Sequence, residues 1–141
     1  MYDKNETFEF VIYKENFLSD KECDELIKTL DTEELTDGEL VGDYEDNVVN
    51  KNVRQTLNID FHDENLFKRL NGAINVANLQ YFKYDIDSID TLRFLKYGIG
   101  GTYNWHTDYG RNQCSMRKLT AIIQLSDGKD YEGGDFEFGI T

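Results

Sequence analysis

The sequence contains no proline and, in 141 residues, only two cysteines, two histidines, two methionines and one tryptophan. Without proline, its turns must depend on Gly, Asn, Asp and Ser. Cys23 and Cys114 cannot build a disulfide framework, and neither has a partner at zinc-type spacing. No apolar run approaches the roughly 20 residues that span a bilayer, and the acidic residues 1–9 are unlike a secretory signal. These absences predict a cytoplasmic protein without a membrane segment.

Basic residues are also scarce, with 15 Lys and Arg against 28 Asp and Glu, which gives a formal net charge of −13. Residues 1–90 hold 22 acidic and 9 basic side chains, whereas residues 91–141 hold 6 of each. An acidic chain repels phosphate backbones, so nucleic-acid binding through charge is not expected. Solubility explains the acidity, and a basic protein or peptide partner is the alternative.

The first part of the chain predicts a strand, a helix and a loop. Residues 7–13 alternate as a strand does. Ser19 caps a helix, with Glu22 completing a capping box, and Cys23 is expected to be a small core residue of this helix. Residues 31–46 hold eight acidic side chains and no basic one, which predicts a mobile loop, with a lid over a site as the alternative.

The rest of the chain turns from a helix to strands. Asp63 is expected to cap a helix with an apolar stripe from Leu66 to Tyr81. Alternating or apolar runs predict strands over residues 53–60, 91–97, 118–125 and 135–140, the second of them covered on both faces. Helices early and antiparallel strands later indicate a single α+β domain over residues 1–141, built around a β-sandwich or barrel.

The stretch His106-Thr107-Asp108 has the residue types of a metal site. On an extended chain, residues i and i+2 point to the same side, so one imidazole nitrogen and one carboxylate oxygen can hold one face of a metal ion. A second histidine would complete the facial triad of non-heme Fe(II), which leaves open positions for cosubstrate and O₂. His-x-Asp by itself is a weak signal, because a His beside an Asp is more often a hydrogen-bonded pair.

The motifs around this pair resemble, in order and spacing, those of the 2-oxoglutarate/Fe(II) oxygenases of the prolyl 4-hydroxylase group. They are Leu92-Arg-Phe-Leu-Lys-Tyr97, Gly98 to Gly101, Tyr103, His106-Thr-Asp108, Arg117-Lys-Leu-Thr120, Gln124-Leu-Ser-Asp127 and Tyr131-Glu-Gly133-Gly134. Upstream, residues 17–27 resemble the helix that opens many such domains. The resemblance implies a double-stranded β-helix core (a jelly roll, cupin-like) with N-terminal supporting helices.

The resemblance also implies cofactors and residue roles. The cofactors would be Fe(II) and 2-oxoglutarate, with ascorbate as an accessory, and the substrate would be a peptidyl group such as prolyl, or a small molecule. The implied metal ligands are His106 and Asp108. The residues implied to bind the cosubstrate are Tyr97, Thr120 and Gln124. Those implied to face the substrate are Arg54, Tyr103 and Trp105.

Several of these roles have plainer alternatives. Tyr97, Thr120 and Gln124 can be satisfied polar groups in a sheet, and Arg54 can be a surface arginine. Tyr103 and Trp105 fall on the opposite parity from His106 in a regular strand, which indicates a core or rim position unless the strand bulges at Gly100-Gly101. Gly133-Gly134 is expected to serve a turn that needs positive φ.

The sequence departs from the group in one respect: no histidine follows His106, and the Lys or Arg expected after that second histidine is also missing. We therefore expect the chain to be the front part of a longer protein, incomplete at its C-terminus and inactive by itself, with exposed sheet edges that a homo-oligomer could cover. A non-catalytic barrel module of the same lineage, acting in protein interaction, is the alternative. A cupin-like metal or sugar binder is a weaker third option, because it would require further histidines.

Overall fold

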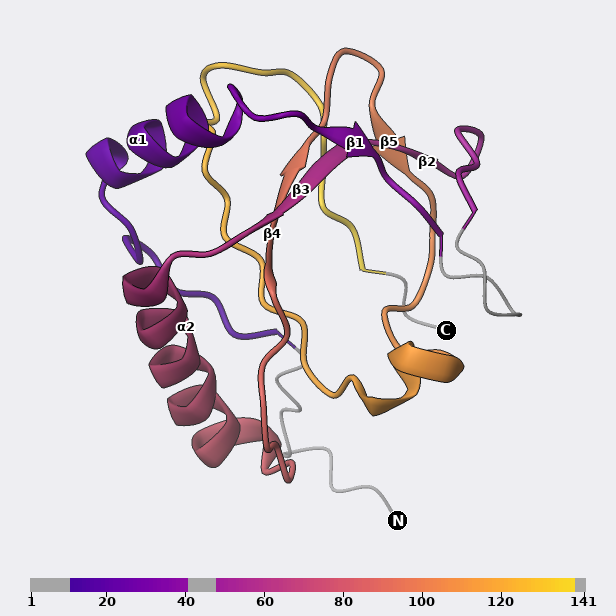
Figure 1. The fold of residues 1–141 in the computed structure, drawn as a ribbon. Coiled ribbons are helices and arrows are strands. Elements are labelled where there is room, and N and C mark those ends of the chain that lie inside the picture. The colour runs from indigo at the N-terminus through magenta and orange to yellow at the C-terminus, as the bar shows by residue number, and fades with distance from the viewer. Residues whose placement is uncertain (1–10, 41–47, 139–141) are drawn as a thin grey trace.

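The computed structural model describes residues 11–40 and 48–138, which form a mixed α+β arrangement of two α-helices and two small antiparallel sheets (Figure 1). The α+β class predicted from the sequence is confirmed at this level. In chain order the elements are α1 (Asp20–Leu30), β1 (Thr36–Asp37), β2 (Arg54–Gln55), β3 (Leu57–Phe61), α2 (Glu64–Ala77), the π-helix η1 (Asn78–Phe82), β4 (Leu92–Lys96), β5 (Thr102–Tyr103) and the 3-10 helix η2 (Asn112–Met116).

Helix α1 begins at the predicted capping box. The Ser19 hydroxyl accepts a hydrogen bond from the Glu22 backbone N–H at 3.3 Å, and the Glu22 carboxylate accepts one from the Ser19 backbone N–H at 2.8 Å. That backbone bond, with further bonds from Arg69 and the Ser19 hydroxyl, lowers the pKa of Glu22 to about 2. Arg69 of α2 also donates to the Phe17 carbonyl oxygen at 2.6 Å, so it ties α2 to the start of α1.

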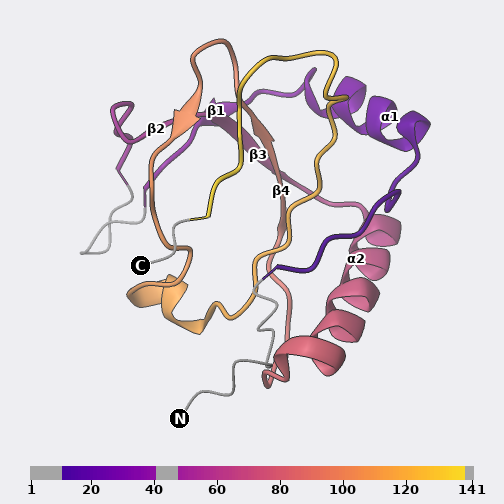
Figure 2. The ribbon, with the colours of Figure 1, turned by 180° about the vertical axis from the view of Figure 1, so that it is seen from behind.

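Helix α2 begins at the predicted cap Asp63, whose carboxylate accepts from the Leu66 N–H at 2.9 Å. It continues into η1, which ends at Lys83 in the left-handed conformation with φ 57°. The buried Asn78 side chain fixes the exit by bonding both the backbone N–H and the carbonyl oxygen of Tyr84, at 2.9 and 2.8 Å. In both ribbon views the two α-helices lie on the same side of the strands (Figures 1 and 2).

The strands divide between two sheets. Strand β3 is central in the order β1-β3-β4, with Thr36 opposite Asn58 and Ile59 opposite Phe94. Strand β2 pairs with β5 and sets Arg54 opposite Tyr103. The chain changes sheet between β1 and β2, between β2 and β3, and between β4 and β5, whereas the consecutive strands β3 and β4 pair within one sheet.

Strand β4 is covered on one face rather than on both, so that prediction is wrong. Phe94 is 8% exposed, whereas its neighbour Leu95 is 42% exposed. Arg93 shares the face of Leu95 and pairs with Asp60 through two hydrogen bonds, which lowers the pKa of the Asp60 carboxyl. A charged pair of this kind favours contact with solvent.

The predicted strand over residues 118–125 is absent, and so is any strand over residues 135–138. Alternation selects which side chains face inward, but a strand also needs a neighbour to bond its backbone. Leu119, Ile123 and Leu125 keep the half-buried phase of the pattern although no ladder forms. Of the predicted first strand, residues 7–10 lie outside the described residues and residues 11–13 are not a strand.

The acidic segment predicted as a mobile loop is partly ordered. Residues Thr36–Asp37 form β1, and Leu40 bridges Val48; residues 41–47 lie outside the described residues. The positive φ predicted at Gly133-Gly134 is confirmed, with values of 72° and 68°.

Few apolar side chains are buried. Among the described residues they are Leu18, Leu30, Leu66, Phe94 and Cys114, and none is completely enclosed. Cys23, expected in the core, is half-buried, and both cysteines are free thiols. Over residues 11–40 and 48–138, no helix has the length and apolar character needed to cross a bilayer.

Candidate metal centre

The chain reaches the predicted site through a tight glycine turn. After β4, the Gly101 N–H donates to the Gly98 carbonyl oxygen at 2.8 Å, and Gly100 adopts φ 75°. A Cβ on Gly101 would stand 2.8 Å from the Gly98 carbonyl oxygen and 3.1 Å from that of Gln55, so the turn packs closely against β2. Strand β5 follows, and the Asn104 N–H extends its pairing to the Val53 carbonyl oxygen at 2.8 Å.

The structure brings the His106 and Asp108 side chains together. Nε2 of His106 lies 3.3 Å from Oδ1 of Asp108, with the two side chains 35% and 43% exposed. Nδ1 of His106 lies 2.7 Å from the Asn104 carbonyl oxygen. A carbonyl oxygen can only accept, so Nδ1 carries a proton and, in the neutral imidazole, Nε2 presents its lone pair to Asp108. Oδ2 of Asp108 accepts a hydrogen bond from the Thr120 hydroxyl at 2.6 Å.

The spacing of this pair fits two adjacent ligands of one metal ion. Metal–ligand bonds of about 2.1–2.3 Å at a right angle place the ligand atoms about 3.0–3.3 Å apart. The Asn104 carbonyl and the Thr120 hydroxyl orient the ring and the carboxylate in the way that outer partners orient metal ligands. A protonated imidazole donating to Asp108 fits the same distance, and a metal titration distinguishes the two arrangements.

The described residues supply only part of a coordination shell here. Within residues 11–40 and 48–138, no group of three or more His, Cys, Asp or Glu side chains is arranged to hold a metal ion. A metal on His106 and Asp108 would therefore take its other ligands from water or small molecules, unless further protein ligands are present outside the described part of the chain.

Tyr103 stacks on His106, which the strand-parity expectation did not anticipate. The ring centroids are 3.5 Å apart and the planes 16° from parallel. Parity does not extend this far, because β5 ends at Tyr103 and the chain bends at Trp105. Burial raises the pKa of Tyr103, with the positive charge of Arg54 opposing and the negative charge of Asp108 adding to the shift.

Arg54 is buried rather than a surface arginine. Its guanidinium donates to the Thr56 hydroxyl and the Glu39 carbonyl oxygen, both at 2.9 Å, and its Cζ lies 4.8 Å from the Tyr103 ring centroid. Because the imidazole already fills one face of the Tyr103 ring, the guanidinium must occupy the other. Arg54, Tyr103 and His106 thus form one stacked column. No carboxylate pairs with Arg54 among the residues that the structure describes.

The remaining predicted residues are Tyr97, Gln124 and Trp105. Tyr97 is about half exposed, and burial raises its pKa, while Arg54 lowers it and Asp108 adds to the rise. The Gln124 amide instead donates to the Ser126 carbonyl oxygen at 3.3 Å. Trp105 is 69% exposed.

Three supporting residues were not predicted from the sequence. Asn104 orients the imidazole through its backbone carbonyl oxygen, and no pattern of side chains could have predicted this contact. Thr56 accepts from Arg54, and its i+2 spacing on an alternating segment is the only signal that could have indicated this. A Cβ on Gly38 would overlap the Thr56 hydroxyl and stand 2.6 Å from Nε of Arg54, so a glycine there admits the guanidinium.

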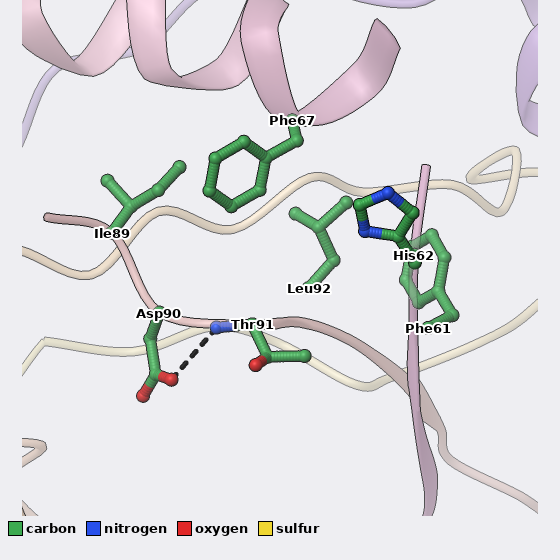
Figure 3. Close-up of a pocket in the computed structure, with 7 residues that line it drawn as sticks. All are labelled: Phe61, His62, Phe67, Ile89, Asp90, Thr91 and Leu92. Atoms are coloured by element: carbon green, nitrogen blue, oxygen red, sulfur yellow. Dashed lines mark hydrogen bonds between the residues drawn. The ribbon is translucent and has the colours of Figure 1, made fainter. Parts of the chain in front are cut away.

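The second histidine lies at a separate hollow. His62, between β3 and α2, lines a pocket of about 280 Å³. In Figure 3 the side chains of Phe67, Ile89 and Leu92 point toward one another, whereas the Asp90 carboxylate turns to the Thr91 backbone N–H, which donates to it at 2.8 Å. The pocket includes none of the predicted site residues.

Comparison with family models, with curated proteins and with solved structures finds no match to this chain.

Proposed function

We propose that this chain carries the first metal-binding motif of an Fe(II)- and 2-oxoglutarate-dependent oxygenase domain of the prolyl 4-hydroxylase type. The ordered motifs from Leu92 to Gly134 motivate the proposal. The observation that carries it is the meeting of His106 Nε2 and Asp108 Oδ1 at 3.3 Å, with Asn104 and Thr120 orienting both groups.

A double-stranded β-helix is the fold proposed for the complete domain. The division of the strands between two sheets supports it, because β1, β3 and β4 form one sheet while β2 and β5 form the other. Strands that alternate between two facing antiparallel sheets are the defining feature of a jelly roll. The half-buried apolar side chains of residues 118–125 are the natural site for a further strand.

In the proposed enzyme, His106 and Asp108 would hold the metal, and Thr120 would keep one carboxylate oxygen occupied so that the other faces the imidazole. Fe(II), when bound with 2-oxoglutarate and O₂, supplies C–H hydroxylation with succinate and CO₂ as co-products, and ascorbate would keep the metal reduced. Tyr97, Thr120 and Gln124 are proposed to contact 2-oxoglutarate. Of these, Tyr97 is the donor that we favour, because the Thr120 hydroxyl already bonds Asp108 and the Gln124 amide bonds Ser126.

A peptidyl group, such as a prolyl ring, is the proposed substrate, and a small molecule is the alternative. Arg54, Tyr103 and Trp105 are proposed to face it. Arg54 and Tyr103 belong to the stacked column beside the metal pair. Trp105 contributes an exposed indole next to His106.

The decisive assay is succinate formation by the protein expressed from its complete reading frame, with Fe(II), ascorbate and 2-oxoglutarate supplied. We expect turnover that His106→Ala and Asp108→Ala abolish, with His62→Ala as the matched control that retains it. Absence of both turnover and 2-oxoglutarate binding would refute the oxygenase proposal.

A non-catalytic module of the same lineage is the second candidate, and the lack of a third His, Cys, Asp or Glu ligand beside His106 and Asp108 among the described residues favours it. It predicts that the protein from the complete reading frame binds no 2-oxoglutarate and that His106→Ala leaves its partner binding unchanged.

A further inference from the structure

The loop that carries the candidate metal pair also exposes large apolar side chains. We define it as the site loop, residues 105–118. Trp105, Tyr109 and Met116 in it expose 69%, 62% and 78% of their surfaces. Exposed apolar residues also occur on other elements of this chain, and those of the site loop are distinguished by the basic side chains beside them in the sequence.

The site loop is closed by its own bonds. The Gly110 N–H and the Arg117 N–H both donate to the Cys114 carbonyl oxygen, at 3.4 and 3.3 Å, and Cys114 itself is buried. Lys118 at the loop's end returns to its start, with its ammonium 5.9 Å from the Tyr109 ring centroid. The exposed side chains therefore stand on a folded loop and need little ordering to bind a partner.

The charge of the site loop is opposite to that of the molecule. It holds three basic residues, Arg111, Arg117 and Lys118, and one acidic residue, Asp108, so its net charge is +2 in a chain of net −13. The single carboxylate faces His106 and Thr120 instead of a partner. Arg117 is paired with Asp90 at 4.0 Å, so Arg111 and Lys118 are the cations that the loop offers beside its aromatic and aliphatic surface, and they attract carboxylates flanking an apolar side chain.

We propose that the site loop docks an acidic polypeptide segment with an aromatic or aliphatic side chain between its carboxylates. The idea that this segment is the substrate of the oxygenase rests on the proposed function. The idea that the site loop binds such a segment does not. A flat anionic membrane fits less well, because the rest of the chain carries −15 (−13 minus +2). Docking on a bilayer would bring the negative charge of the chain within a Debye length of about 8 Å of the anionic lipid headgroups. A peptide contacts the loop alone.

Trp105 is the only tryptophan, so its fluorescence reports on the proposed surface directly. The probe is an acetylated peptide of alternating Asp and Glu around Leu and Phe, and its matched control carries Lys at each acidic position. Titrated into EDTA-treated protein, the acidic peptide should shift and saturate the emission, with an affinity that falls as salt rises. The lysine peptide should bind at least tenfold more weakly.

The variant Arg111→Glu/Lys118→Glu tests the cations. The matched control Lys21→Glu/Lys28→Glu makes the same charge change on α1, which lies at the opposite corner of the molecule from η2 in both ribbon views (Figures 1 and 2). We expect roughly a tenfold or greater loss of acidic-peptide affinity for the loop variant and less than about twofold for the control.

Several results would overturn the proposal: equal binding of the two peptides, equal losses in the two variants, or binding to phosphatidylserine vesicles without binding to the acidic peptide. Because the titration is metal-free, the two proposals fail separately. Peptide docking without Fe(II)-dependent turnover by the protein from its complete reading frame would overturn only the oxygenase, and turnover without docking would overturn only this surface.

Discussion

Replacing Arg54 by Met tests whether the stacked column holds the candidate metal centre in place. The guanidinium makes two hydrogen bonds of 2.9 Å and covers one face of Tyr103. Hydrogen bonds to a charged group contribute about 1.5–3 kcal/mol each, and a cation over an aromatic ring about 0.5–2 kcal/mol. Relief of the cost of burying a charge that has no carboxylate partner within residues 11–40 and 48–138 offsets part of this sum. We expect Arg54→Met to lower the free energy of unfolding by about 2–4 kcal/mol.

Urea unfolding followed by far-ultraviolet circular dichroism measures this loss of stability. Arg54→Lys, which keeps the positive charge but not the planar set of guanidinium donors, should lose about half as much unfolding free energy. The imidazole resonances of His106 should also shift, because Tyr103 stacks on it at 3.5 Å, while those of His62 should not. A loss under about 0.5 kcal/mol, or an unmoved His106 signal, would refute the column as a support of the site.

Three other predictions follow from particular contacts. Gly38→Ala forces a Cβ into the Arg54 guanidinium and should lower the free energy of unfolding in urea by about 1–3 kcal/mol. The helical control Gly72→Ala, whose Cβ meets nothing within 4 Å, should raise it by about 0.5–1 kcal/mol. Equal effects of the two substitutions would contradict the reasoning. The pKa of Glu22 is lowered from about 4.5 to about 2, so its ionised carboxylate stabilises the fold at higher pH, and this stabilisation is lost as the pH falls through about 2. The difference in unfolding free energy between the protein and Glu22→Gln should therefore shrink as the pH falls from about 4.5 to about 2. A difference that stays constant would contradict this reasoning. Burial raises the pKa of Tyr97, so Tyr97→Phe should remove a late-titrating phenol from the ultraviolet absorbance titration, and loss of an early one would contradict it.

Local signals in the sequence predicted the helices well, because a cap acts over three residues. Ser19 and Asp63 each bond a backbone N–H three positions on, so their short-range patterns determine where α1 and α2 begin. The sequence predicted a strand over residues 118–125, and the structure has none there. A strand depends on a neighbour distant in the sequence, and alternation specifies only the face that turns inward.

The site shows the same limit. The i+2 spacing of His106 and Asp108 predicted that both side chains would face one point, and they meet at 3.3 Å. The parity argument failed for Tyr103 because the strand ends there and the bend at Trp105 changes the direction of the chain. The support of Arg54 by Gly38 and Thr56 depends on long-range packing, and no single-sequence pattern encodes it.

The most direct test of the metal centre is a titration of Mn(II), a stable probe for the Fe(II) site, into the 141-residue chain, followed by the two histidine side chains in the NMR spectrum. We predict weak binding at one site that broadens the His106 imidazole before that of His62. His106→Ala and Asp108→Ala should each abolish this binding, and His62→Ala should retain it. Unchanged binding by a His106→Ala/Asp108→Ala double variant, or no broadening of His106 at saturating Mn(II), would contradict the account.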